Sequence, residues 1–394
     1  MKYTKKELHY FLISSYLEAR MAERNKSTQL LFEVEQERNL YNLCEEIYNR
    51  TYKPSPPICF LIKEPTYREV FAPAFKDRIV SHLLFNSIAP IFEKTFIYDS
   101  YSCRKGKGTL FGINRMEYFL RSCTEDYKYL NETWVLSLDI SGYFMSIHRP
   151  TLYNLVMNIL NKYQYQHLYK GSKQLWDDVI DYSLCEYLIS GLLLRDPRDG
   201  VTIINKDSDD WNLLPPNKSL FNAPKNTGLP IGDLTSQLFS NIYLGQFDQF
   251  MKRDLGCHYY GRYVDDSRII SRDKQFLQDL IPKADEYLKD KLSLSLHPKK
   301  TQIQPAKFGI NFLGQIIRPH RRYAKNKTIK SFSTLAWKLS KKEDITGKDI
   351  SSVNSYLGYF QWVREFGELE KIIKRFGLDK ILDFNNNYKT AKLR

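Results

Sequence analysis

The chain lacks the features that mark secreted, membrane-spanning and zinc-binding proteins. Its 6 cysteines show no CxxC pairing, so we expect free thiols in a reducing compartment. No apolar run reaches the roughly 18 residues of a membrane span, and the first residues contain no apolar signal segment. The 7 histidines are scattered, without the spacing of a His/Cys metal site. We therefore expect a cytoplasmic protein with no membrane partner.

Positive charge, in contrast, is abundant. The 394 residues include 59 Lys or Arg and 45 Asp or Glu, which gives a net charge of +14. The excess is concentrated near the C-terminus, where the segment from Arg318 onward has eighteen basic and eight acidic residues. Such an excess is typical of proteins that bind a phosphate backbone. The composition, 42% hydrophobic and 26% charged, indicates a folded chain long enough for two or three subdomains.

Two adjacent carboxylates, Asp265 and Asp266, lie between apolar runs that predict two short strands joined by a tight turn. Adjacent acids repel each other, so a buried pair is stable only when a cation neutralises it. A further apolar strand begins at Trp134 and ends at Asp139, which supplies a third carboxylate. Mg²⁺ prefers carboxylate oxygens, so the pattern predicts a two-metal phosphoryl-transfer site. A solvated Asp-Asp turn and a helix-capping Asp139 are the ordinary alternatives.

In these motifs the chain resembles the reverse transcriptases, from about Lys53 to Trp362. The segment 138–144 (LDISGYF) resembles the first palm motif of that family, and 263–266 (YVDD) resembles the second. The resemblance implies an α+β right-hand polymerase with fingers, an antiparallel palm sheet and a helical thumb. It also implies RNA-directed DNA synthesis, in which a primer hydroxyl attacks the α-phosphate of a dNTP and pyrophosphate leaves.

The resemblance further implies two Mg²⁺ ions, for which Mn²⁺ can substitute. Asp139, Ile140 and Asp265 would hold the ions, and Asp266 would complete the acidic cluster. Phe144 stands five residues after Asp139, where the family has the aromatic side chain that excludes a ribose 2′-hydroxyl. Phenylalanine is more often an ordinary core residue, and that alternative stays open.

The loop that begins at Gly228 departs from the common family pattern. Most reverse transcriptases have Gln-Gly where this chain has Ile231-Gly232, and Ser-Pro where it has Ser236-Gln237. This departure resembles the reverse transcriptases of diversity-generating retroelements. In that subgroup an aliphatic residue replaces the glutamine, and copying is error-prone opposite template adenines. A neutral exchange within a packed loop is the alternative.

The resemblance assigns the remaining contacts by position. The nucleotide set is Arg68, Lys63, Phe144, Tyr143, Ile231, Gly232, Gln237 and Lys300, of which Arg68 and Lys63 would contact the triphosphate and Lys300 the leaving pyrophosphate. The template and primer set is Arg104, Lys105, Lys107, Phe312, Leu313, Gly314, Arg321 and Arg322. A solvated basic loop is the alternative for the first three.

We expect three parts: a helical extension over 1–50, interleaved fingers and palm over 51–320 with a polar insertion at about 195–225, and a basic helical thumb over 321–394. The expected partners are template RNA, dNTPs, nascent DNA and a small basic accessory protein. Three alternatives stay open. One is a phage-defence reverse transcriptase that uses a noncoding RNA or a partner reverse transcriptase. The others are untemplated or protein-primed synthesis, and a catalytically silent RNA-binding protein.

Overall fold

The computed structural model describes residues 2–21, 26–63, 66–385 and 388–393. The N-terminal part of the chain contains α1 (Lys5–Met21), α2 (Ser27–Val34) and α3 (Gln36–Tyr48). Helix α1 packs against α3 and α4 (Phe75–Glu93). Its buried residues Leu8, Leu12, Tyr16 and Ala19 recur at helical spacing, so one apolar stripe covers the neighbouring helices.

The centre of the molecule is an antiparallel palm sheet in the strand order β5-β6-β3-β7. Its strands are β3 (Trp134–Leu138), β5 (Tyr259–Tyr263), β6 (Asp266–Ser271) and β7 (Gln302–Pro305). The predicted strand–turn–strand around the adjacent acids is therefore confirmed. Leu138 pairs with Ser267, so the strand order and register bring Asp139 beside the turn between β5 and β6.

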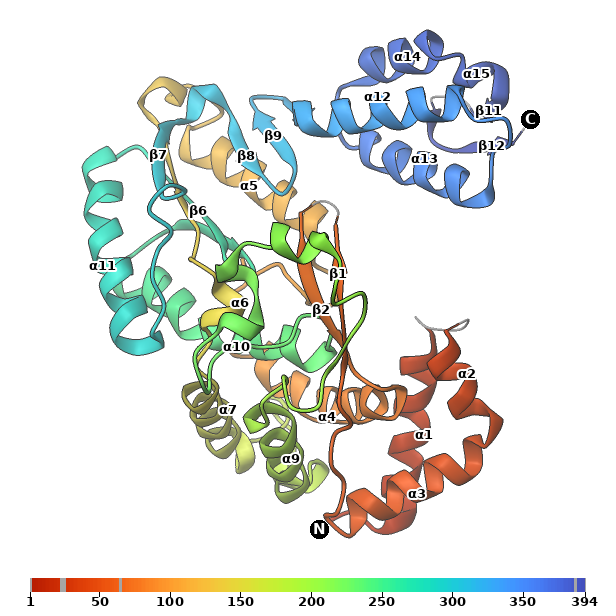
Figure 1. The fold of residues 1–394 in the computed structure, drawn as a ribbon. Coiled ribbons are helices and arrows are strands. Elements are labelled where there is room, and N and C mark those ends of the chain that lie inside the picture. The colour runs from red at the N-terminus through yellow and green to blue at the C-terminus, as the bar shows by residue number, and fades with distance from the viewer. Residues whose placement is uncertain (1, 22–25, 64–65, 386–387, 394) are drawn as a thin grey trace.

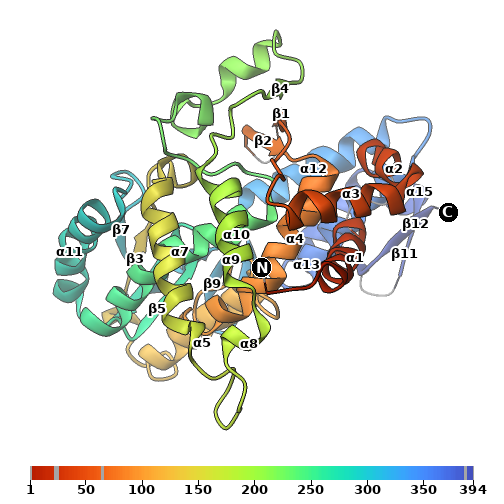
Figure 2. The same cartoon turned by 90° about the horizontal axis from the view of Figure 1, so that it is seen from below.

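Both faces of the palm sheet are covered, because successive strand residues point to opposite sides. Leu136 and Ile269, paired across β3 and β6, belong to the main core. Val135 and Ile270, the next pair, belong to a second core under α5 (Thr109–Cys123). The main core is built with α4, α7 (Arg149–Gln164), α9 (Tyr182–Ile189), α10 (Leu234–Gln249) and α11 (Lys274–Leu292), grouped in Figures 1 and 2. Two short helices, α6 (Tyr143–Ser146) and α8 (Trp176–Val179), complete this part.

The fingers contain β1 (Ile58–Ile62) paired with β2 (Arg68–Ala72) in an antiparallel arrangement. The polar segment 195–225, expected as an insertion, contains short regular elements. It contributes β4 (Thr202–Ile203), which pairs in parallel with β1, and three short 3₁₀ turns between Asp209 and Asn222. The segment is held by buried Glu69, whose carboxylate accepts hydrogen bonds from the Ser219 hydroxyl at 2.9 Å and from the Leu220 amide.

A second small sheet, in the order β8-β9-β10, connects the palm to the C-terminal helices. Its strands are β8 (Ile310–Phe312), β9 (Gln315–Arg318) and β10 (Arg321–Ala324). The helices α12 (Asn326–Ser340), α13 (Gly347–Phe360), α14 (Phe366–Arg375) and α15 (Leu378–Ile381) then build a core of their own. These helices form the thumb, seen as a separate unit in Figure 1.

The expectation of helix to the end of the chain is wrong for the last residues, which form the hairpin β11 (Leu382–Phe384) and β12 (Ala391–Leu393). Asn385 follows β11, and asparagine side chains favour turns over helix. Asn385 accepts hydrogen bonds from the Lys389 and Thr390 amides. Among the described residues, no helix has the length and apolar character needed to cross a membrane.

Candidate active site

Three carboxylates meet at one end of the palm sheet. Asp265 and Asp266 follow Val264, whose φ of 55° places it in the left-handed region that a tight turn requires. Asp139 follows β3, and its carbonyl accepts a hydrogen bond from the His297 amide at 2.7 Å. The segment after α11 therefore fixes the backbone of Asp139 next to the acidic turn.

The carboxylates repel one another in this arrangement. Burial, and secondly the charge of Asp139, raise the pKa of Asp265 to about 6. Burial also raises the pKa of Asp266, although Arg268 beside it acts in the opposite direction. Asp139 is paired with Lys300, whose Nζ lies 2.8 Å from Asp139 Oδ2. A bound cation would stabilise the ionised form of these acids.

The donor set fits divalent metal ions that arrive together with a nucleotide. Within the part of the chain that the structure describes, no group of three or more His, Cys, Asp or Glu is already arranged as a metal cage. Mg²⁺ rarely needs one, because it commonly binds through one or two carboxylates, substrate phosphates and water. Asp139 and Asp265 are the carboxylates that would hold such ions, together with the backbone at Ile140, which lies in an isolated bridge with Leu296.

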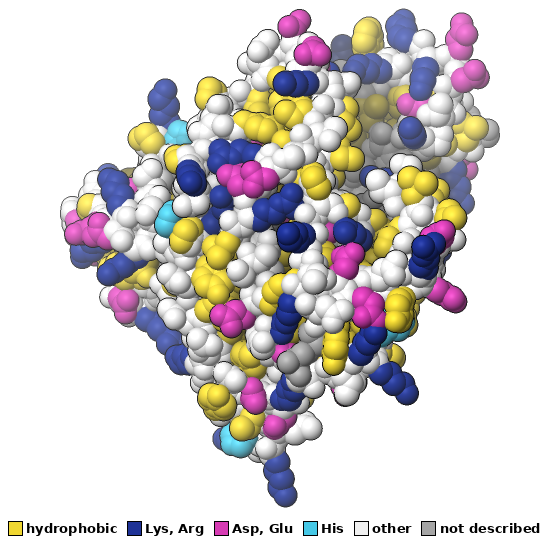
Figure 3. All heavy atoms as spheres, turned by 60° about the horizontal axis from the view of Figure 1, so that its bottom comes forward, with side chains coloured by type: hydrophobic (Ala, Val, Ile, Leu, Met, Phe, Trp, Pro, Cys, Tyr) yellow, Lys and Arg dark blue, Asp and Glu magenta, His cyan; other side chains and the backbone are white. Residues whose placement is uncertain are grey.

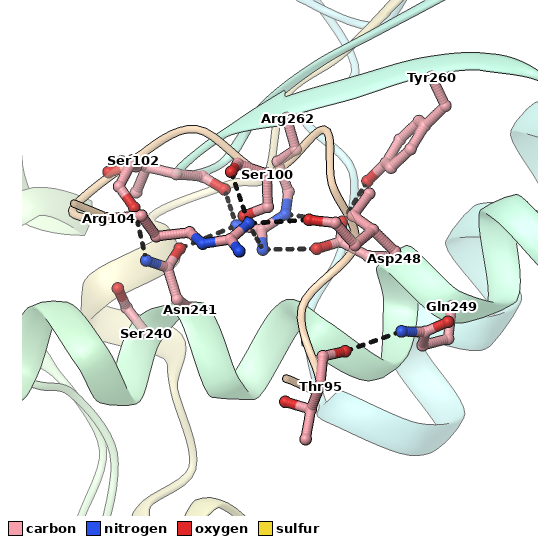
Figure 4. A network of polar contacts seen from close by, with 12 residues as sticks. Thr95, Ser100, Ser102, Arg104, Ser240, Asn241, Asp248, Gln249, Tyr260 and Arg262 are labelled. Atoms are coloured by element: carbon pink, nitrogen blue, oxygen red, sulfur yellow. Dashed lines mark hydrogen bonds and ion pairs between the residues drawn. The ribbon is translucent and has the colours of Figure 1, made fainter. Parts of the chain in front are cut away.

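A buried ion pair supports the acidic turn from behind (Figure 4). Arg262 on β5 is 1% exposed and forms two hydrogen bonds to Asp248 on α10, at 2.7 and 2.6 Å. Arg262 Nη1 also donates to the Val264 carbonyl at 2.7 Å. The Tyr260 hydroxyl donates to Asp248 at 2.7 Å, which satisfies the carboxylate further. The guanidinium thus connects helix α10 to the first residue of the turn.

The same network extends to the loop before α5. Arg262 Nη2 lies 3.3 Å from the Ser100 hydroxyl, and the Asn241 amide donates to the Ser102 carbonyl at 2.8 Å (Figure 4). The sequence did not indicate a role for Arg262, Asp248 or Lys325. The positive charge of Lys325 lies close enough to Asp266 to favour the ionised form of that carboxylate. Arg262 lies at a position of an apolar strand that faces the core, where a charged residue is unusual. This is the one sequence signal that could have indicated its structural role.

Two residues of the predicted nucleotide set come together between fingers and palm. Phe144 and Ile231 are half-buried and contact one apolar cluster that includes Phe71. The Ile231 carbonyl accepts a hydrogen bond from the Phe71 amide at 2.8 Å. Gly232 has a φ of 122°, and a Cβ there would lie 2.9 Å from the Phe71 carbonyl oxygen, so glycine is required. The loop is therefore held directly against the fingers sheet.

The other residues of this set differ in their surroundings. Tyr143 is 3% exposed and its hydroxyl donates to the Ser240 carbonyl, so the predicted nucleotide contact of its side chain does not fit. Arg68 is exposed at the start of β2, and Gln237 is exposed in the first turn of α10. Lys63 Nζ lies 2.7 Å from Asp210, which connects the fingers to the polar segment.

Three residues of the predicted template and primer set make internal contacts. Arg104 donates to Glu93 and to the carbonyls of Ile97 and Ser100, and its side chain is 7% exposed, so it stabilises its own loop. The Phe312 side chain is fully buried, and Arg322 is bonded to Glu117. These surroundings do not fit the predicted nucleic-acid contacts of the three side chains.

The remaining residues of that set leave more surface open. Lys105 and Arg321 are exposed. Lys107 lies over the Tyr98 ring, and burial lowers its pKa to about 8. Leu313 and Gly314 form a turn with positive φ, and the Gly314 carbonyl accepts a hydrogen bond from the Tyr359 hydroxyl of the thumb at 2.7 Å.

The fold and the site together define a right-hand polymerase, with the acids on the palm sheet between fingers and thumb. Residues 201–317 match the family model described as reverse transcriptase (RNA-dependent DNA polymerase). The matched segment contains the Ile231 loop and the Asp265-Asp266 turn and begins after Asp139. This part of the chain is therefore similar to the reverse transcriptase family, whose members are RNA-directed DNA polymerases.

Known proteins resemble the chain at low identity. Protein YkfC of Escherichia coli (strain K12) is 24% identical over 322 residues, which are 73% of this chain and 73% of that protein. Telomerase from Candida tropicalis aligns with a TM-score of 0.48 and 12% identity, over 83% of this chain and 59% of the telomerase chain. Candida albicans telomerase, in a complex with a fragment of telomeric RNA, aligns with a TM-score of 0.47 and 10% identity, over 87% and 61% of the two chains. The chain thus spans about three fifths of the length of these telomerases.

Proposed function

We propose that this protein copies an RNA template into DNA by two-metal nucleotidyl transfer at Asp139, Asp265 and Asp266. The observation that carries the proposal is the meeting of these acids at one end of the palm sheet, with Lys300 2.8 Å from Asp139. Figure 3 shows lysine and arginine side chains scattered over one face of the molecule, among hydrophobic and acidic ones. The basic thumb, 321–394, would clamp the duplex through its phosphates.

Each residue of the site has a distinct role in this mechanism. Asp139 and Asp265 would hold the metal ions, which activate the primer hydroxyl and stabilise the leaving pyrophosphate when bound. Arg262 keeps the Val264 carbonyl in place and so orients the turn that carries both acids. Lys300 neutralises Asp139 before the nucleotide binds and then lies where it can meet the leaving pyrophosphate. Arg68 is exposed and free to contact the triphosphate from the fingers.

We further propose relaxed fidelity, as in a diversity-generating retroelement. The supporting feature is the aliphatic Ile231, together with Ser236-Gln237, on a loop that is bonded to the fingers sheet. A structured template RNA and a small basic accessory protein are the partners that this proposal implies. Mg²⁺ is the proposed metal, with Mn²⁺ as a substitute.

Substitution of one acid tests the catalytic proposal. We expect Asp265→Asn to abolish dNTP incorporation while it preserves RNA binding, because it removes a metal ligand without changing side-chain size. Primer extension with Mg²⁺ and an RNA filter-binding assay measure the two properties. An Asp273→Asn variant, at the start of α11 away from the turn, serves as control and should extend primers normally. Retained synthesis by Asp265→Asn would contradict the assignment.

The biological role is tested by sequencing the RNA that copurifies with the protein and the DNA made from it. Complementary DNA from one RNA, with substitutions concentrated at template adenines, supports the diversity-generating role. Accurate, repetitive or untemplated DNA would overturn it and favour a phage-defence enzyme, which would use the same acids.

A further inference from the structure

An open pocket of about 290 Å³ lies where the thumb meets the palm. It is formed by the turn between β9 and β10, by α5 and by the segment after α13. Three arginines line it together with a histidine, a tryptophan and one carboxylate: Arg321, Arg322, Arg364, His320, Trp362 and Glu117. The pocket therefore carries a net positive charge.

Only one of these arginines is neutralised within the pocket. Arg322 donates to Glu117, with Nε at 3.0 Å, and to Asn114 at 2.7 Å. Arg321 and Arg364 are exposed, and no ion pair to either is formed among the described residues. A backbone hydrogen bond from the Arg364 amide to the Arg322 carbonyl, at 2.9 Å, holds the two segments together. Three guanidinium groups thus line one pocket that holds a single carboxylate, and an anion bound there would reduce their mutual repulsion.

The pocket also offers an aromatic surface. Trp362 is 52% exposed, although a tryptophan ring usually buries most of its area. An exposed tryptophan beside unpaired arginines is the combination with which proteins bind single-stranded nucleic acid: the cations contact phosphates and the ring stacks on a base.

The pocket is separate from the catalytic acids. Lys325 interacts with Asp266, whereas Arg321 stands at the other end of β10, about 13 Å away along the strand. The His320 ring contacts Tyr127, which follows α5, with centroids 4.6 Å apart. The pocket therefore opens beside α5 rather than beside the acidic turn.

The geometry points to a second nucleic-acid site, in which Arg321 and Arg364 bind phosphates of a single strand and Trp362 stacks on one of its bases. This inference rests on the proposed function, because it requires that the protein handles nucleic acid. Phosphates and bases occur in RNA and DNA alike, so the strand is either unpaired template RNA or released DNA.

The test uses the full chain with its cleft saturated by a short unlabelled hairpin primer–template. Binding of fluorescent single-stranded RNA and DNA oligonucleotides of one sequence is then measured against salt. We expect Arg321→Ala/Arg364→Ala to weaken binding of at least one strand about tenfold and to lower the salt slope by about one to two. Trp362→Ala should weaken it about as much, and Trp362→Phe should retain most of the affinity.

A matched control separates a specific site from general charge. Arg253→Ala/Arg375→Ala removes two exposed arginines that do not line the pocket and should leave binding unchanged. Equal losses in both double variants, or no binding by the wild type once the cleft is filled, would overturn the inference. Primer extension on the hairpin reports the proposed function independently, and we expect Trp362→Phe to retain it.

Discussion

At the scale of single residues, Phe144 links the two parts of the proposed nucleotide site. Its carbonyl accepts a hydrogen bond from the Leu229 amide at 2.8 Å, so it is attached to the loop that carries Ile231. Its ring lies edge-on to buried Tyr143, with centroids 5.4 Å apart. The ring position is therefore fixed from one side by the core, while its other side stays partly exposed.

We predict that Phe144→Ala admits ribonucleotides, because removal of the ring makes room for a 2′-hydroxyl. The ratio of dNTP to rNTP incorporation should fall by at least about tenfold, measured by single-nucleotide extension. Phe221→Ala removes a ring from the same apolar cluster and should not change this ratio. Unchanged sugar discrimination in Phe144→Ala would mean that Phe144 is only a core residue.

We predict that Ile231→Gln lowers misincorporation, since a glutamine amide can form hydrogen bonds that an aliphatic side chain cannot. The error spectrum of copied DNA, obtained by deep sequencing, measures this effect, which should be largest opposite template adenines. Ile203→Gln, on β4 in the same cluster, is the control and should leave the spectrum unchanged. If both variants copy with wild-type errors, the loop does not set fidelity.

At the scale of secondary-structure elements, the Arg262–Asp248 pair joins β5 to α10 inside the core, where both side chains are at most 1% exposed. Burial of two charges is costly, and the cost is offset here because each partner is also hydrogen-bonded to other groups. Removal of one partner leaves the other charged and unpaired, which is far less favourable than the loss of a surface pair.

We predict that Arg262→Ala lowers the free energy of unfolding by about 3–5 kcal/mol and slows primer extension, because the Val264 carbonyl loses its donor. Chemical denaturation and extension rates measure the two effects. Arg272→Ala breaks an exposed pair with Glu125 and should cost less than about 1 kcal/mol. Equal stability of the two variants would show that the buried pair contributes no more than a surface pair.

At the scale of the whole molecule, charge is distributed unevenly, since the net charge is +14 and the segment from Arg318 onward holds most of the excess. Association with nucleic acid should therefore be dominated by the release of counterions. The thumb has its own apolar core, so its basic surface is presented by a unit of fixed shape.

We predict that affinity for an RNA–DNA duplex falls about a thousandfold between roughly 50 and 200 mM monovalent salt. Fluorescence anisotropy titrations at several salt concentrations measure the slope. Extension rates at saturating duplex are the internal control and should change little over this range. A shallow slope would show that apolar contacts, rather than phosphates, dominate binding.

Local sequence was sufficient for the strands that carry the acids, because apolar runs bounded by polar turns determine β3, β5 and β6. Local sequence could not predict contacts between residues that are distant in the chain. The parallel bridge of Ile58 with Thr202 and the bond of Arg262 to Asp248 depend on tertiary packing that no local pattern encodes. Tyr143 shows the same limit, since only the fold decides which of two adjacent rings is buried.

The hydrogen bond from Tyr359 to the Gly314 carbonyl joins a thumb helix to the turn at Leu313 and Gly314, which the family resemblance assigns to template and primer contacts. The thumb helices share one apolar core, so a tilt of these helices would be transmitted through this bond to that turn. Loosening of the clamp would therefore also displace the primer terminus. The processivity of synthesis and the alignment of the primer terminus would then depend on the same contact. The length of DNA made in one binding event would be greater when the thumb tilts less often.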